Sequence, residues 1–225
     1  MLLDVRKLTK SFKKGGVRAV QGATFSLEAG KTLGIIGASG SGKSTLLKLI
    51  LKLEKLDQGE IYFEEKRIDC LPEKKLKDFR RKTQIIFQDP YLSLDPRMKV
   101  VDILKEPYLI TGEKDRLLMD KKINGLLDSV GLSPHFLLRY PHELSGGECQ
   151  RIAVARAISL GPSLLLCDEA VSSLDLMTKI QILNLLLTLQ KERGISFLFV
   201  SHDERAVRHM SDEVWVMKEG VLSPS

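Results

Sequence analysis

The residues best suited to chemistry begin with a glycine-rich segment that could bind phosphate groups. Residues 37–44 read GASGSGKS, which matches the pattern G-x-x-x-x-G-K-[ST]. A glycine turn that merely connects two elements is the alternative, but this segment follows an apolar strand and opens a helix, as the motif requires. Glycines let backbone N–H groups converge on phosphate oxygens, and the helix N-terminus adds partial positive charge. The segment predicts a nucleotide site with Lys43 on the β- and γ-phosphates and the Ser44 hydroxyl on Mg²⁺; its contact residues are Gly37, Ala38, Ser39, Gly40, Ser41, Gly42, Lys43, Ser44 and Thr45.

Two adjacent carboxylates follow another apolar strand. The run Leu164–Cys167 leads into Asp168 and Glu169, and α/β sheets place their ligands at the carboxyl ends of parallel strands. Asp168 is suited to hold Mg²⁺, and Glu169 is suited to orient and polarise an attacking water. Consecutive acids at a strand end can also simply cap the following turn. Beside a phosphate loop, the catalytic interpretation is favoured.

Single polar residues end two further predicted strands. Gln88 follows Thr83–Phe87, and its amide oxygen could ligate Mg²⁺ or contact the water. His202 follows Ile195–Ser201, and its imidazole could hydrogen-bond the γ-phosphate. The alternatives are a polar strand terminus for Gln88 and an ordinary surface residue for His202. Their common place at strand ends favours a shared site.

A second glycine turn lies far along the chain from the first, in the segment LSGGE at residues 144–148. A simple nucleotide-binding domain has no need of another phosphate-facing glycine turn. Its presence suggests a site that another copy of the chain completes.

The elements that must position these residues follow from the hydrophobic pattern. Strand patterns occur at Leu3–Leu8, Ala23–Leu27, Thr32–Ile36, Glu60–Phe63, Arg67–Ile68, Thr83–Phe87, Ser163–Cys167, Ile195–Ser201 and Glu213–Lys218. Helical spacing predicts an amphipathic helix from Ser44, carried by Leu46, Leu49, Ile50 and Leu53. Further helices are predicted at Cys149–Ser159, Leu176–Arg193 and Asp203–Met210. Their alternation with strands predicts right-handed crossovers and a mainly parallel sheet.

Residues 90–144 have a helical pattern of their own and form a candidate insert. The apolar positions are Leu117, Leu118, Ile123, Leu126, Leu127 and Val130, and Gly131 is predicted to end the helix. The insert separates the strand-rich first third of the chain from the alternating last third.

Composition excludes several classes of protein. A chain of 225 residues with 43% hydrophobic and 28% charged residues fits one soluble α/β domain. The net charge of +6 is spread along the chain, which favours a solvated surface over a nucleic-acid site. Three cysteines, Cys70, Cys149 and Cys167, lack C-x-x-C spacing, so neither a disulfide framework nor a zinc site is indicated. No stretch approaches the ~18 apolar residues of a membrane span.

With these positions in place, nearly the whole chain resembles the nucleotide-binding subunit of an ATP-binding cassette (ABC) transporter. The matching motifs occur in order: Walker A, residues 37–44; Q-loop, Gln88; signature, residues 144–148; Walker B, residues 164–168 with Glu169; D-loop, residues 173–175; and switch, His202. Residues 87–97 and 168–172 resemble the oligopeptide and nickel importer branch. The resemblance implies a P-loop NTPase (RecA-like) α/β core, an N-terminal antiparallel β-subdomain and an inserted helical subdomain. We expect one domain over residues 1–225, with the core and β-subdomain at about 1–89 and 150–225 and the helical subdomain at 90–149.

The resemblance also implies partners and further site residues. Two ABC ATPase subunits, identical or different, would pack head to tail, with each MgATP between one phosphate loop and the partner's Ser145, Gly146 and Gly147. Phe12 resembles the aromatic residue that stacks on adenine, although an apolar core position is the alternative. Asp175 resembles the D-loop acid that couples the two sites. The subunits would lie at the cytoplasmic face of the membrane, docked to permease subunits through about residues 90–106, with an external solute-binding protein as an indirect partner and no nucleic acid.

Three departures from the family pattern bear on these expectations. Glu148 stands where the family usually has Gln, and a carboxylate near ATP phosphates is repulsive unless the helix N-terminus offsets it. Asp95 stands where the branch commonly has Asn, close to the expected docking surface. The sequence ends at Ser225, where many relatives continue.

Other functions are compatible with parts of this pattern. A soluble ABC ATPase acting on DNA or ribosomes usually has a long coiled coil or two cassettes, and this chain has neither. Lys43, Asp168, Glu169 and His202 oppose a non-hydrolysing regulatory subunit, whereas Glu148 leaves this alternative open. For an importer, the solute could be a peptide or nickel.

Overall fold

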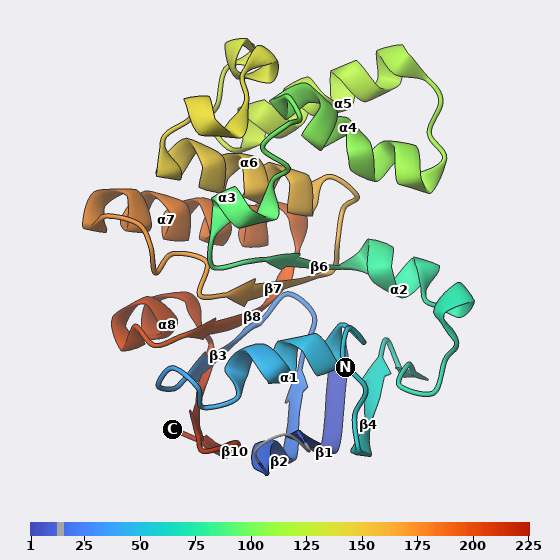
Figure 1. Ribbon diagram of the computed structural model, residues 1–225, viewed down its shortest axis with the longest axis vertical. Helices are drawn as coiled ribbons and strands as arrows, with labels where there is room; N and C mark the ends of the chain where they lie inside the picture. The colour runs from blue at the N-terminus through green and yellow to red at the C-terminus, as the bar shows by residue number, and fades with distance from the viewer. Residues whose placement is uncertain (13–15) are drawn as a thin grey trace.

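The computed structural model describes residues 1–12 and 16–225 and contains two β-sheets (Figure 1). The smaller sheet is antiparallel, with the strand order β2-β1-β4-β5. Its strands are β1 (Leu3–Phe12), β2 (Val17–Leu27), β4 (Gln58–Phe63) and β5 (Lys66–Arg67). The first two extend beyond the ranges predicted from the sequence, and this sheet is the expected N-terminal antiparallel β-subdomain.

The larger sheet carries the predicted site residues. Its order is β10-β9-β3-β8-β7-β6, and every neighbouring pair is parallel except β10 and β9. The strands are β3 (Thr32–Ile36), β6 (Thr83–Ile86), β7 (Leu164–Asp168), β8 (Ser196–Ser201), β9 (Glu213–Lys218) and β10 (Val221–Pro224). The short edge strand β10 is absent from the sequence prediction. Because β3, β8, β7 and β6 are parallel, their carboxyl ends meet at one edge.

Both faces of this sheet are buried, and the alternation of side chains along its strands shows how. In β7, Leu164 and Leu166 belong to one apolar core, whereas Leu165 and Cys167 belong to the other. The first core contains α1 (Lys43–Ile50) and the antiparallel sheet; the second contains α6 (Gly146–Ile158), α7 (Leu176–Arg193) and α8 (Glu204–Met210). Burial on both faces fixes the strand ends relative to one another.

A helical region lies at the end of the molecule away from the antiparallel sheet (Figure 1). It consists of α3 (Pro90–Ser93), α4 (Val100–Thr111), α5 (Arg116–Ser129) and two short 3₁₀ turns, Pro134–Leu138 and Pro141–Glu143. Its apolar side chains join the core on the α6 face of the sheet. The predicted α/β fold with an inserted helical subdomain is therefore confirmed. Within the described ranges, no helix is both long and apolar enough to cross a membrane.

Some details of the sequence prediction are wrong. Helix α1 ends at Ile50, so Leu53 lies past its end and is exposed. Leu117 and Leu118 lie on the first turn of α5 and are also exposed, because its buried stripe runs through Met119, Ile123, Leu126 and Leu127. Helix α6 begins at Gly146 instead of Cys149. A 3₁₀ turn, Glu73–Lys75, and the short helix α2 (Lys77–Lys82) were not predicted.

Candidate functional site

The phosphate-binding motif connects β3 to α1 and has a backbone that requires glycine. Gly42 has a φ of 110°, and a Cβ at this position would collide with the carbonyl oxygen of Ala19. A Cβ on Gly37 would lie 2.5 Å from the carbonyl oxygen of Met217. The loop therefore lies directly against neighbouring backbone, which fixes its conformation.

Lys43 is already placed inside this loop. Its side chain is only 4% exposed, and its ammonium donates to the carbonyl oxygens of Gly37 at 2.8 Å and Ala38 at 2.9 Å. A buried ammonium needs such partners because desolvation is costly. Positive charge, a fixed glycine loop and the N-terminus of α1 together fit the phosphates of ATP.

The two side chains predicted to hold Mg²⁺ meet across the sheet edge. The Ser44 hydroxyl donates to Oδ1 of Asp168 at 2.9 Å, which joins the start of α1 to the end of β7. Burial raises the pKa of the Asp168 carboxyl, and the hydrogen bond from Ser44 opposes this shift. A hydroxyl and a carboxylate are the hard oxygen donors that Mg²⁺ prefers, so this pair fits the predicted metal site.

Glu169 is the centre of the remaining contacts. It has a φ of 50°, in the left-handed region, and its N–H donates to the carbonyl oxygen of Val200 at 2.9 Å. Its Oε1 lies 3.6 Å from Nζ of Lys43, and its Oε2 lies 2.7 Å from Nδ1 of His202. The fold thus brings together Lys43, Ser44, Asp168, Glu169 and His202 from the ends of three parallel strands.

Gln88 and Phe12 are less closely tied to this group. Gln88 lies just beyond β6, and its carbonyl oxygen accepts a hydrogen bond of 3.4 Å from the Ser173 hydroxyl. No hydrogen bond of its side chain is present in the described part of the chain. Phe12 ends β1 and is 37% exposed, and Nζ of Lys10 lies 5.1 Å from the centroid of its ring. An exposed ring is available for stacking, which disfavours the alternative of a core position.

The second glycine turn forms the N-terminus of α6. Ser145 is the N-cap, and Gly146 and Gly147 open the helix. A Cβ on Gly147 would lie 2.7 Å from Cγ2 of Thr178 in α7, so this turn also packs closely. Asp175 caps α7 by accepting from the N–H groups of Met177 and Thr178, and hydrogen bonds from Thr178 lower the pKa of Asp175. Both helix starts line one hollow of about 290 Å³.

The two glycine turns do not meet within one chain. Figure 1 shows the N-terminal ends of α1, α6 and α7 on the same side of the molecule. In this view, helices α7 and α8 lie between α6 and α1. No hydrogen bond or ion pair within residues 1–12 and 16–225 joins residues 37–45 to Ser145, Gly146 or Gly147. The two glycine turns therefore lie on the same side of the molecule without a hydrogen bond or ion pair between them in the described residues.

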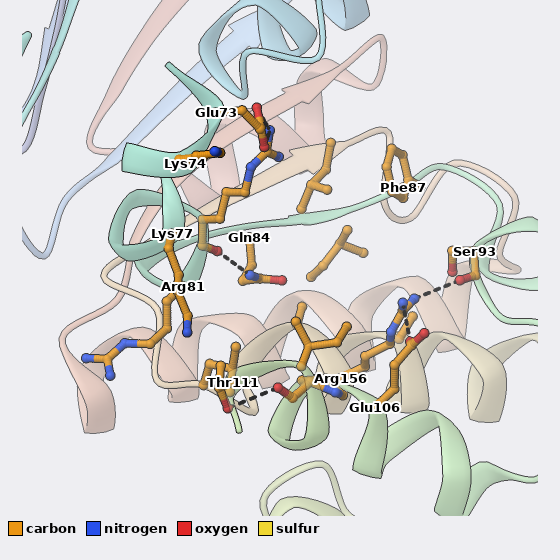
Figure 2. A pocket seen from close by; sticks show the side chains of 18 residues that line it. Glu73, Lys74, Lys77, Arg81, Gln84, Phe87, Ser93, Glu106, Thr111 and Arg156 are labelled. Carbon is orange, nitrogen blue, oxygen red and sulfur yellow. Dashed lines mark hydrogen bonds and ion pairs between the residues drawn. The ribbon is translucent and has the colours of Figure 1, made fainter. Parts of the chain in front are cut away.

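A second cavity, which the sequence did not predict, lies between α2, the end of β6, α4 and α6 (Figure 2). Its volume is about 600 Å³. Phe87 and Ile110 contribute exposed apolar side chains, and Lys74, Lys77 and Arg81 line its edge. The only signal in the sequence is that Phe87 and Ile110 are apolar residues next to the ends of a strand and a helix.

The ion pair of Arg156 with Glu106 lies in the wall of this cavity. Arg156 of α6 donates to Oε2 of Glu106 at 2.8 Å and to the carbonyl oxygen of Ser93 at 2.9 Å, as Figure 2 shows. Arg156 therefore links α6 to α4 and to the end of α3, the segment that follows Gln88.

Comparison with known proteins agrees with this geometry. A family model described as "ABC transporter" matches residues 20–172. The chain is 46% identical to the putative oligopeptide transport ATP-binding protein YkfD of Bacillus subtilis, over 97% of this chain and 68% of that protein. It is 43% identical to the oligopeptide transport ATP-binding protein OppF of Streptococcus mutans, over 98% of this chain and 73% of that protein.

Solved structures show the same fold. The ATP-binding cassette MJ0796, in a dimeric post-hydrolysis state with ADP and Pi, has a TM-score of 0.88 and 28% identity, covering 99% of this chain and 98% of that one. Together with the family match and the grouping of Lys43, Asp168 and Glu169, this likeness identifies the chain: it belongs to the ABC transporter family, and its ATP-binding cassette is an ATPase.

Proposed function

We propose that this chain is the ATP-hydrolysing subunit that powers uptake of peptides by an ABC importer. The relatives described above are named for oligopeptide transport, and the chain is also 49% identical to the glutathione import ATP-binding protein GsiA of Salmonella typhimurium, over 92% of this chain and 33% of that protein. Glutathione is itself a small peptide. These names favour peptides over nickel, and they favour transport over action on DNA or ribosomes.

The observation that supports the chemistry best is the contact of Glu169 with both Lys43 and His202. We assign Lys43 and the backbone N–H groups of residues 37–45 to the ATP phosphates. Glu169 orients a water and accepts its proton as the water oxygen attacks the γ-phosphorus and the bond to the β-phosphate oxygen breaks, which yields ADP and phosphate. His202 donates a hydrogen bond to the γ-phosphate, and the ring of Phe12 stacks on adenine.

We further propose that Ser44, Asp168 and Gln88 hold Mg²⁺. When bound, the ion would neutralise charge that develops on the phosphate oxygens. The Ser44–Asp168 hydrogen bond supports the first two ligands because it shows that their oxygens already converge. Gln88 is supported by its position at the end of β6, beside these strands.

The site is proposed to be complete only when two cassettes meet. Among the described residues, no hydrogen bond or ion pair joins Ser145, Gly146 or Gly147 to the phosphate loop of the same chain, and the N-terminal ends of α6 and α1 lie on the same side of the molecule (Figure 1). In a head-to-tail pair, this turn would reach the γ-phosphate held by the partner, and Asp175 would lie beside the same contact. The dimeric state of MJ0796 supports such a pair.

The cavity of Figure 2 is proposed as the permease-docking surface. It includes Ser93 and Glu106, which lie in the segment expected to dock, and it connects through Arg156 to the residues after Gln88. A helix of a permease subunit inserted into this cavity would therefore sense movement of the residues that follow Gln88. We propose that the docked subunit lies at the cytoplasmic face of the membrane and that a solute-binding protein acts from outside. We also propose residues 90–149 as the helical signature subdomain between core segments 1–89 and 150–225.

The proposal is tested by purifying the chain with its membrane partners in lipid vesicles and measuring ATP hydrolysis. We expect peptides, delivered by the solute-binding protein, to stimulate hydrolysis, and Glu169→Gln to suppress it while ATP still binds. Stimulation by nickel alone would contradict the assignment to peptides. Stimulation by DNA or ribosomes in the absence of membrane partners would contradict the transport function.

A further inference from the structure

Glu148 accepts a hydrogen bond from the Ser145 hydroxyl, the group that the proposed two-copy site requires for the γ-phosphate. Its Oε2 accepts hydrogen bonds from the N–H of Ser145 at 2.7 Å and from the Ser145 hydroxyl at 2.8 Å. In return, Oγ of Ser145 accepts from the N–H of Glu148 at 3.3 Å. The proton of the serine hydroxyl therefore points at a carboxylate of the same helix turn.

This capping arrangement keeps a negative charge at the start of α6. The hydrogen bonds from Ser145, first from its backbone and then from its side chain, lower the pKa of Glu148, so the carboxylate is ionised at neutral pH. The groups around it are Arg139 and His135, which favour the ionised form, and the hydroxyl of Tyr91. The N–H groups of Gly146 and Gly147 make no hydrogen bond in the described chain and stay available to a ligand.

We propose that Glu148 sets the ATP concentration at which two copies close, because its carboxylate competes with the γ-phosphate for the Ser145 hydroxyl. The inference rests on the proposed two-copy site. Closure requires the hydroxyl to exchange one anionic acceptor for another, and it brings the carboxylate towards the phosphates. Both steps oppose closure, and neither affects the binding of ATP to the phosphate loop of a separate copy.

The variant Glu148→Gln removes the negative charge but keeps a side-chain acceptor for the N–H of Ser145. A glutamine amide oxygen still accepts from the N–H of Ser145, but as a neutral acceptor it holds the hydroxyl less strongly than a carboxylate does. We therefore expect Glu148→Gln to lower the ATP concentration for half-maximal pairing by about threefold to tenfold. Glu148→Ala removes the cap as well, and we expect it to lower the melting temperature by a few degrees, on the order of other cap losses.

The experiment measures pairing of the full chain against MgATP concentration by analytical ultracentrifugation, in a Glu169→Gln parent in which hydrolysis is suppressed. Glu143→Gln is the matched control. Glu143 caps the preceding 3₁₀ turn by accepting from the N–H of Tyr140 at 2.7 Å, so this variant removes a nearby capping charge without touching Ser145. ATP binding by separate copies is measured at protein concentrations too low for pairing, and the melting temperature of each variant is recorded.

A lower midpoint for Glu148→Gln, with unchanged binding by separate copies and a smaller loss of melting temperature than in Glu148→Ala, supports the inference. The Glu143→Gln control should leave the midpoint in place. If Glu148→Gln leaves the midpoint unchanged or raises it while the parent pairs normally, the inference is overturned and the proposed function stands. If the parent binds ATP and never pairs, the two-copy site is wrong and the inference falls with it.

Discussion

Nδ1 of His202 lies 2.7 Å from Oε2 of Glu169, although 33 residues separate them in the sequence. The other oxygen of Glu169 faces Nζ of Lys43 at 3.6 Å. One carboxylate thus bridges the imidazole at the end of β8 and the ammonium of the phosphate loop. Glu169 reaches this position from a left-handed backbone conformation directly after β7.

The first prediction concerns His202. Removing the imidazole in His202→Ala should lower the turnover rate by about 10²-fold or more, because the variant loses the contact with Glu169 and the proposed hydrogen bond to the reacting phosphate. Binding of ATP should be nearly unchanged, since Lys43 and the loop are intact. Steady-state hydrolysis and equilibrium ATP binding measure the two effects, and full turnover in His202→Ala would exclude its assigned role.

Asp168 should reduce the stability of the protein at neutral pH. Its pKa is raised in the folded state, so the folded protein binds its proton more tightly than the unfolded chain does. The free energy of unfolding therefore falls as pH rises from the ordinary carboxyl range through the raised pKa. Asp168→Asn should melt at a higher temperature than the parent at pH 7, by about 2 °C, and the difference should vanish at acidic pH.

Calorimetry without nucleotide, at pH 7 and at a pH below the ordinary Asp value of 3.8, measures this difference. Asp128→Asn, an exposed aspartate on α5, is the control and should change little. A lower melting temperature for Asp168→Asn at pH 7 would show that its contact with Ser44 outweighs the cost of burial.

Gly42 should tolerate no side chain. In Gly42→Ala, the positive φ and the collision with the Ala19 carbonyl act together, so the loop must move and the free energy of unfolding should fall by about 1–3 kcal/mol. Gly30 has a φ of 75° and nothing near its Cβ position, so Gly30→Ala isolates the cost of the backbone conformation. We expect ATP binding to be lost only in Gly42→Ala, as measured by titration calorimetry.

The cavity of Figure 2 should determine partner binding. Ile110 is 73% exposed at its edge, so Ile110→Glu should leave the fold intact and greatly reduce co-purification with the permease subunits. Leu117 is 83% exposed on α5 and lies outside the cavity lining, so Leu117→Glu is the control. Equal loss in both variants would indicate a general effect of added charge, and no loss in Ile110→Glu would remove this surface from the docking site.

The sequence predicts the chemistry of this protein better than its surfaces. The strand Thr32–Ile36, the phosphate loop and the acids after β7 are local patterns, and each is recognisable without knowledge of the fold. Pairing of Ser44 with Asp168 spans 124 positions, and it was predictable only because both residues lie at the carboxyl edge of one parallel sheet. The prediction of the site therefore depends on the topology of that sheet.

What the sequence did not predict depends on packing between distant segments. The cavity between α2, β6, α4 and α6 arises from residues that share no motif. The exposure of Leu117 and Leu53 depends on where each helix begins and ends, which apolar spacing alone does not determine. The contact of Glu148 with Ser145 is a local exception, because the spacing S-x-x-E at residues 145–148 is the sequence pattern of a capping box and could have predicted it.

The most direct test of the account is the mass of the Glu169→Gln chain in the presence of MgATP, with and without a second change, Ser145→Arg. We predict that MgATP doubles the mass of Glu169→Gln from 25.3 kDa. We also predict that Glu169→Gln with Ser145→Arg binds ATP equally well and stays at the mass of one chain, since arginine blocks the turn that the partner's nucleotide must reach. Undiminished pairing of the doubly substituted chain would contradict a site shared between two copies.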